Sequence, residues 1–345
     1  MGVWLGLIGV TGGMFVVWFL FVSLWGLRGE GASSRFVAAG VLVTAQVILS
    51  EILLGQLRVL TLSMAVTLNL TLSGIVLWGL LWGSRNRVAA VFEPILRLGQ
   101  GIQGWWEDVR GWENVIMIFL TGILVIWLGA AAYLLPPRGV DDVYHLPPVY
   151  QYLQDQRIVL LPLELRPQFA YPENGELLFL WPLLFLHDAR AVDMVQGVVA
   201  LFGGLVLYTL VLRFGGQRRL AFFVGLLFLF TPVVAGQAGS AYIDLIVSVY
   251  YLAALALAAE FWRKGRLATF YIAGLTGGLL IGMKYTMLLF VLGLQPLLLY
   301  PLWKGWGRGG LRHGWIYLIL LIIGGGYWYV RNMVILGSPI VLGIG

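Results

Sequence analysis

The residue types best suited to chemistry stand close together in one short segment: Asp141, Asp142, Tyr144 and His145. Two adjacent carboxylates repel each other, which raises the pKa of one and suits it to act as a general base near neutral pH. The other carboxylate can then hold a metal ion or a hydrogen-bond partner. The same pair also suits the start of a helix before Pro147, because acidic side chains stabilise the first backbone N–H groups. The spacing leaves both interpretations open.

Three more candidates lie at the ends of apolar runs: Asp244, Lys284 and Arg331. A charge at the centre of a bilayer costs about 2.5–3.5 kcal/mol, so their positions are informative. Asp244 by itself is best explained as an acid at the start of a helix. Lys284 and Arg331 can either reach lipid headgroups or hold a phosphate, and the arginine favours bidentate contacts. Glu51 is expected near the membrane interface, without a role.

The composition identifies the environment of these residues. Sixty per cent of the chain is hydrophobic and 11% is charged, whereas soluble domains carry about 25% charged residues. There is no cysteine, which excludes disulfides and thiolate metal sites, and the three histidines are too scattered for a zinc site. The net charge of +6 fits cytoplasmic loops, and no basic stretch alternates with aromatic residues as nucleic-acid binding would require. We therefore predict an integral membrane protein that does not bind nucleic acid.

The apolar residues occur in runs of about 20, enough to cross a hydrocarbon layer about 30 Å thick. The predicted spans are 3–27, 36–57, 60–82, 115–135, 194–212, 220–235, 242–261, 268–283, 285–302 and 315–330. The first run is a span rather than a secretory signal, because no Lys or Arg precedes Arg28. With the N-terminus outside, 15 of the 22 basic residues fall in inside loops. The fold class is thus an all-α polytopic membrane protein of about ten transmembrane helices.

We divide the chain into three parts. Residues 1–83 form a three-helix transmembrane segment, 84–113 a cytoplasmic amphipathic connection, and 114–345 the main transmembrane module. This module contains an outer loop at 136–193, which is too apolar and aromatic to be disordered.

Within that outer loop we expect short helices. One covers 143–154, beginning near Pro147 and Pro148. A second apolar stretch, 177–186, is too short to span and is expected to lie along the membrane surface. Farther along the chain, Gly274, Gly278 and Gly282 recur every fourth residue, which predicts close packing against another helix.

Four motifs carry a resemblance to a known family. Asp-Asp-Val-Tyr-His-Leu-Pro at 141–147 and Pro-Glu-Asn-Gly-Glu-Leu-Leu-Phe at 172–179 resemble the first outer loop of bacterial, mannosyltransferase-like GT-C glycosyltransferases. Gly-Met-Lys-Tyr-Thr at 282–286 and Tyr-Val-Arg-Asn at 329–332 are similar to the same group. The resemblance covers about 115–339. Three spans precede it, and relatives usually continue beyond the equivalent of Gly345, so we expect a truncated or split member.

The resemblance implies a reaction at the outer face of the plasma or inner membrane. A sugar would pass from a polyprenyl-phosphate donor to a lipid, glycan or protein acceptor, with inversion at the anomeric carbon. Asp141 or Asp142 would be the catalytic base, and Lys284 and Arg331 would neutralise the lipid phosphate. The acceptor or metal would be held by Asp244, Tyr144, His145 and Glu176. Asp142 and Asp244 are the candidate ligands for a divalent cation, Mg²⁺ or Mn²⁺.

Two functions of other classes compete with this one. A transporter or flippase of lipid-linked glycans would place ionisable residues near the membrane midplane, on broken helices in paired repeats. A non-catalytic subunit of a membrane complex would leave the carboxylates pointing apart. The charges of this chain lie at the ends of its spans and no inverted repeat is evident, which favours the glycosyltransferase.

Overall fold

The computed structural model describes residues 2–27, 30–83, 104, 111–134, 144–163 and 167–341. These residues form helices joined by short links, and no strand occurs among them. The helices are α1 (Gly2–Phe21), α2 (Ala32–Gln56), α3 (Leu62–Gly83), α5 (Trp112–Leu134), α6 (Leu146–Asp155), α7 (Asn174–Leu186), α8 (Arg190–Arg213), α9 (Arg218–Leu229), α10 (Pro232–Gln237), α11 (Asp244–Lys264), α12 (Leu267–Ile281), α13 (Met287–Trp306) and α14 (Gly310–Leu336). The predicted connection at 84–113 lies largely outside the described residues.

Seven helices in the described part of the chain are long and apolar enough to cross a membrane: α1 with its π-helical extension, α2, α3, α8, α11, α13 and α14. The chain is a multi-pass membrane protein. Two of the other predicted spans, 115–135 and 268–283, coincide with α5 and α12, whose apolar parts are shorter. The span predicted at 220–235 is interrupted, because α9 ends at Leu229 and α10 begins at Pro232, whose missing N–H cannot continue the preceding helix.

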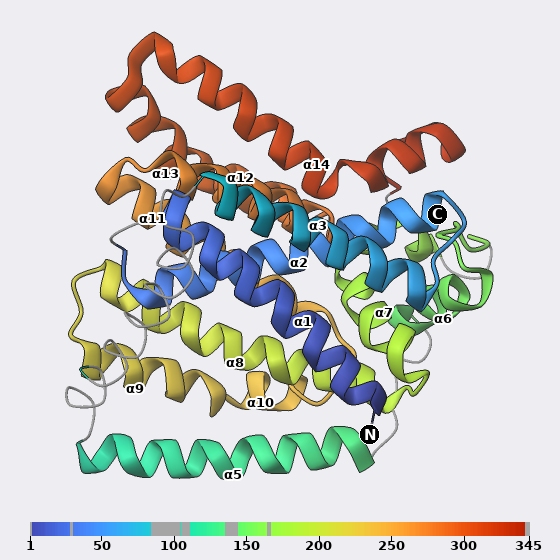
Figure 1. Ribbon diagram of the computed structural model, residues 1–345, viewed down its shortest axis with the longest axis horizontal. Helices are drawn as coiled ribbons and strands as arrows, with labels where there is room; N and C mark the ends of the chain where they lie inside the picture. The colour runs from blue at the N-terminus through green and yellow to red at the C-terminus, as the bar shows by residue number, and fades with distance from the viewer. Residues whose placement is uncertain are drawn as a thin grey trace.

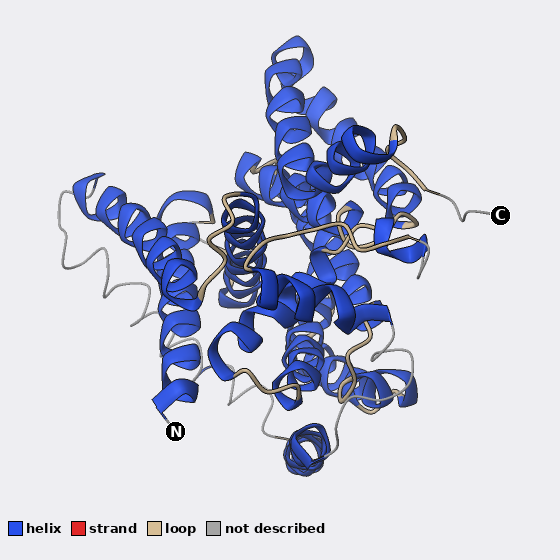
Figure 2. Cartoon of the chain, turned by 90° about the vertical axis from the view of Figure 1, so that its right-hand side faces the viewer, coloured by secondary structure: helices blue, strands red, loops and turns tan. Residues whose placement is uncertain are grey.

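The helices run between two ends of the molecule, as Figure 1 shows. We call the end with α6 and α7 the loop end; it lies on the right in Figure 1 and faces the viewer in Figure 2. Helix α14 runs along one edge and α5 along the other. The centre is formed by α2 and α11, where 72% and 67% of the apolar stretch is buried, against 28% in α14.

Helix α7 shows how the loop end is packed. It is too short to span, as predicted, but eleven of its thirteen residues are buried. Neighbouring helices α1, α2, α6 and α8 cover it, so it does not lie on an open membrane surface as the sequence suggested. Helix α6 begins at Leu146 with prolines in its first turn, which confirms the predicted helix start.

The predicted close packing of the glycine helix is confirmed at the crossing of α12 and α14. A β-carbon on Gly278 would lie 3.0 Å from Cα of Gly324, and one on Gly324 would lie 2.8 Å from the backbone nitrogen of Leu279. No side chain fits between two backbones at this separation. The side chain of Asn174 secures the same crossing by donating to the carbonyl oxygens of Leu279 and Gly324. This packing holds the start of α7 against α12 and α14.

Candidate active site

A buried polar pair joins the starts of α6 and α7. The Nδ1 atom of His145 lies 2.8 Å from Oε1 of Glu176, and both side chains are about 95% buried. Asp141 and Asp142, the predicted base, lie outside the described residues, four and three positions before His145. The pair holds His145 in place. His145 lies close to the point where the described chain resumes after the two aspartates.

A second pair is partly open to solvent. The Nζ atom of Lys284, in the turn between α12 and α13, lies 2.5 Å from Oδ1 of Asp244 at the start of α11. The side chains are 39% and 48% exposed. Asp244 therefore begins a helix, as predicted, and also neutralises the lysine that the sequence assigned to a phosphate. Both groups remain reachable by a ligand that competes for either of them.

Two tyrosines connect these pairs. The ring of His145 lies 4.2 Å from the ring of Tyr144 and 6.1 Å from that of Tyr242, two residues before Asp244. Burial, followed by the negative charges of carboxylates that include Glu176 and Asp244, raises the pKa of Tyr144. The Tyr144 hydroxyl therefore stays protonated near neutral pH and is available as a hydrogen-bond donor.

Arg331 occupies a different position from Lys284. It is 7% exposed, its guanidinium lies 4.7 Å from the centre of the Trp328 ring, and its Nη1 atom lies 4.0 Å from Oε1 of Glu173. Glu173 accepts a hydrogen bond from the Tyr152 hydroxyl. Burial raises the pKa of Glu173 to about 8; the positive charge of Arg331 lowers this pKa, and the negative charge of Glu176 raises it.

The backbone of residues 169–171 accepts hydrogen bonds from Arg331 and from the residue that follows Lys284. Arg331 donates weakly to the carbonyl oxygens of Phe169 and Tyr171, at 3.4 and 3.5 Å. The hydroxyl of Tyr285, next to Lys284, donates to the carbonyl oxygen of Ala170 at 3.0 Å, and the side chain of Asn332, next to Arg331, donates to the same oxygen at 2.6 Å. The structure thus brings Asp244 to Lys284 and His145 to Glu176, while Arg331 belongs to a separate site.

The sequence analysis missed one carboxylate at this end of the molecule. Glu173 stands inside the motif at 172–179, but its burial and its neighbours Tyr152 and Arg331 come from distant parts of the chain. The motif could have pointed to Glu173 as a candidate residue. The sequence could not show that Glu173 and Glu176 have different partners.

A divalent cation is a further expectation for this end of the molecule. Among the residues that the structure describes, no three His, Asp or Glu side chains are grouped to hold a metal ion. Asp244 offers a carboxylate near Tyr144, but Lys284 already neutralises it. A site built from Asp142 and Asp244 thus stays a prediction, because Asp142 lies outside the described residues.

Comparison with known proteins finds a similarity over part of this chain. Residues 177–324 match the model of the dolichyl-phosphate-mannose-protein mannosyltransferase family. The match includes Asp244 and Lys284 and makes this stretch of the chain similar to membrane glycosyltransferases. No curated protein and no solved structure matches the chain.

Proposed function

We propose that this protein transfers a sugar from a polyprenyl-phosphate donor to an acceptor, at the loop end of its helices and on the outer face of the membrane. The observation that carries the proposal is that the Asp244–Lys284 pair and the His145–Glu176 pair lie near each other, linked by the contact of His145 with Tyr242, and that His145 follows Asp142 by three residues. These groups come from four separate elements. The family match over 177–324 supports the same class of reaction.

The proposed reaction is a single displacement at the anomeric carbon. The carboxylate of Asp141 or Asp142 accepts the proton of an acceptor hydroxyl, whose oxygen forms the new bond to the sugar. The bond between the sugar and the lipid phosphate breaks, and the phosphate keeps the electron pair. One displacement inverts the configuration at that carbon.

Lys284 stabilises the departing phosphate in this scheme. Its ammonium group is held by Asp244 and is 39% exposed, so it is oriented before the donor arrives. A cation that is already in place stabilises the developing charge without having to reorganise. The divalent cation, if Asp142 and Asp244 bind one, would add positive charge at the same place.

The test is a double variant, Asp141→Asn with Asp142→Asn. Membranes from cells that express the chain supply native acceptors and receive radiolabelled dolichyl-phosphate mannose, the donor named by the matched family. We expect transfer to fall by about 10²-fold or more, because general base catalysis contributes that much.

A matched control separates catalysis from a general loss of charge. Asp188 lies at the same end of the molecule, where its carboxylate is paired with Arg190 at 2.7 Å and is 35% exposed. Asp188→Asn should transfer sugar at the rate of the unmodified protein. Full activity in the double variant would eliminate the proposed base, and a non-catalytic subunit or a flippase would then explain the chain better.

A further inference from the structure

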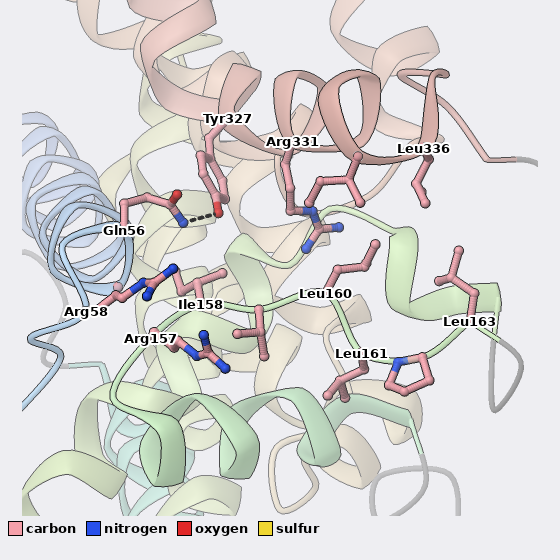
Figure 3. Close-up of a pocket in the computed structure, with 14 residues that line it drawn as sticks. Gln56, Arg58, Arg157, Ile158, Leu160, Leu161, Leu163, Tyr327, Arg331 and Leu336 are labelled. Atoms are coloured by element: carbon pink, nitrogen blue, oxygen red, sulfur yellow. Dashed lines mark hydrogen bonds between the residues drawn. The ribbon is translucent and has the colours of Figure 1, made fainter.

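A cavity of about 600 Å³ lies at the loop end, and Arg331 lines it whereas Asp244 and Lys284 do not. Figure 3 shows it between the end of α2, the segment after α6 and the last turns of α14. The Gln56 side chain donates to the Tyr327 hydroxyl at 2.5 Å and closes one side. The backbone bond from Leu60 to Gln156, 3.0 Å long, holds the end of α2 beside the segment after α6.

Three arginines line this cavity: Arg58, Arg157 and Arg331. They come from the N-terminal helices, the loop and the last helix, and all three lie outside the residues matched by the family model. Figure 3 shows the guanidinium of Arg331 pointing into the cavity, with those of Arg58 and Arg157 on the side nearest α2. Arg331 is 7% exposed, and its Nη1 atom has no hydrogen-bond partner among the described residues.

The positive charge in the cavity is incompletely balanced. Arg157 has Asp155 at 3.8 Å, and Arg331 has Glu173 at 4.0 Å. Burial raises the pKa of Glu173 to about 8, so near neutral pH this carboxyl is largely protonated and does not neutralise the arginine. A buried guanidinium without a full counter-charge is costly unless an anion completes it.

The remaining wall of the cavity is apolar. It consists of side chains from the segment after α6 and from the last turn of α14: Ile158, Val159, Leu160, Leu161, Pro162, Leu163, Ile335 and Leu336. In Figure 3, Leu163 and Leu336 lie at the end away from Arg58 and Arg157. A free anion would leave this surface unused, whereas a hydrocarbon chain attached to the anion would cover it.

We infer that this cavity binds the phosphate group of an amphiphile, with the three arginines on the phosphate oxygens and the hydrocarbon chain along the leucine-rich wall. Guanidinium groups bind phosphate through paired, charge-assisted hydrogen bonds. The site is distinct from the Asp244–Lys284 pair and gives the protein a second place for an anionic ligand. The inference rests on the proposed function in one respect, the choice of a polyprenyl phosphate as the amphiphile.

The experiment measures binding by calorimetry, with the full chain in phosphatidylcholine nanodiscs. Three probes separate the possible ligands: farnesyl phosphate, the uncharged farnesol, and inorganic phosphate. Farnesyl phosphate should bind at least tenfold more tightly than either of the others. The double variant Arg58→Gln with Arg157→Gln should weaken its binding by about tenfold or more, since hydrogen bonds to charged groups contribute that much.

Two variants complete the set. Arg331→Lys keeps the buried charge but loses the paired geometry, and it should also bind farnesyl phosphate about tenfold more weakly. Arg190→Gln removes an exposed arginine at the same end of the molecule, outside the cavity, and should bind like the unmodified protein.

Each contrary result overturns the inference. Equal binding of farnesol would mean an apolar groove without a phosphate site, and equal binding of inorganic phosphate would mean a free-anion site. Unchanged affinity in the double variant would place the ligand elsewhere. Binding without any sugar transfer would instead contradict the proposed function alone, so the two failures can be told apart.

Discussion

At the scale of single residues, burial decides what the carboxylates at the loop end can do. The Asp244 side chain is 48% exposed and meets Lys284 directly. The Glu173 side chain is 5% exposed and lies 4.0 Å from its nearest cation, Arg331. A charged carboxylate at position 173 would lose its hydration without gaining a close ion pair in its place. Asp244 is therefore suited to ionic contacts, and Glu173 to acting as a neutral acid.

Glu173 makes the stability of the protein depend on pH. Its pKa rises from 4.5 to about 8 in the folded chain, mainly through burial. Between these values the folded state holds a proton that the unfolded state has lost. Stability is therefore greatest below about pH 4.5 and falls as the pH rises to about 8, by up to about 1.4 kcal/mol per pH unit.

The variant Glu173→Gln should remove this fall. The free energy of unfolding in detergent is measured at pH 5, 6.5 and 8 for both proteins. The control is Asp188→Asn, whose free energy of unfolding should still decrease with pH as it does in the unmodified protein. Gln keeps an acceptor for the Tyr152 hydroxyl. Parallel pH profiles for Glu173→Gln and the unmodified protein would show that Glu173 ionises normally.

At the scale of elements, the crossing of α12 and α14 positions the loop end. Gly278 and Gly324 bring the two backbones together, and Asn174 at the start of α7 donates to the α14 carbonyl of Gly324 at 2.8 Å. The Trp328 indole donates to the side-chain oxygen of Asn174 at 2.7 Å. The arrangement of α7, which carries Glu176, therefore depends on this crossing.

Gly278→Ala should separate the two helices. The added β-carbon would meet Cα of Gly324 at 3.0 Å, and a backbone atom cannot move aside as a flexible side chain can. We expect a loss of about 1–3 kcal/mol in the free energy of unfolding, as for other overpacked cores, measured by thermal unfolding in detergent. Gly293→Ala in α13 is the control, because nothing lies within 4 Å of its added β-carbon. Equal melting temperatures for the two variants would refute the tight crossing.

At the scale of the whole molecule, an ion cluster closes the end opposite the loop end. Glu30, in the link between α1 and α2, has a fully buried side chain. Its carboxylate lies 2.6 Å from Nζ of Lys264, 3.0 Å from Nε of Arg266 and 3.5 Å from Nη2 of Arg213. These cations belong to the ends of α8, α11 and α12. The cluster therefore fastens the N-terminal helices to the rest of the bundle.

Glu30→Gln should loosen this attachment. Removing one partner of a buried ion pair costs about 3–5 kcal/mol, and we expect the lower end because Lys264 is 39% exposed and Arg266 is 32% exposed. Chemical unfolding in detergent measures the loss. The exposed pair of Asp188 and Arg190 supplies the comparison, since Asp188→Asn should cost about 0–1 kcal/mol. A similar small loss for both variants would mean that the cluster does not hold the bundle together.

The sequence by itself determined the class of the protein and much of its local structure. Long apolar runs predicted the spanning helices, prolines 147 and 148 predicted the start of α6, and the glycines at every fourth position predicted a close helix crossing. These features depend on neighbours within a few turns, so they can be read locally. The motif at 282–286 also placed Lys284 among the candidate residues, and a position at the end of an apolar run did the same for Asp244.

The tertiary structure alone decided which candidates meet. Lys284 pairs with Asp244, 40 residues away, and Arg331 shares a cavity with Arg58 and Arg157. Helix α7 is buried although its short apolar sequence suggested a membrane surface. Hydropathy and spacing report the environment along one helix, whereas a charge finds its partner by the way distant helices pack, and that packing is fixed by long-range contacts that no local pattern contains.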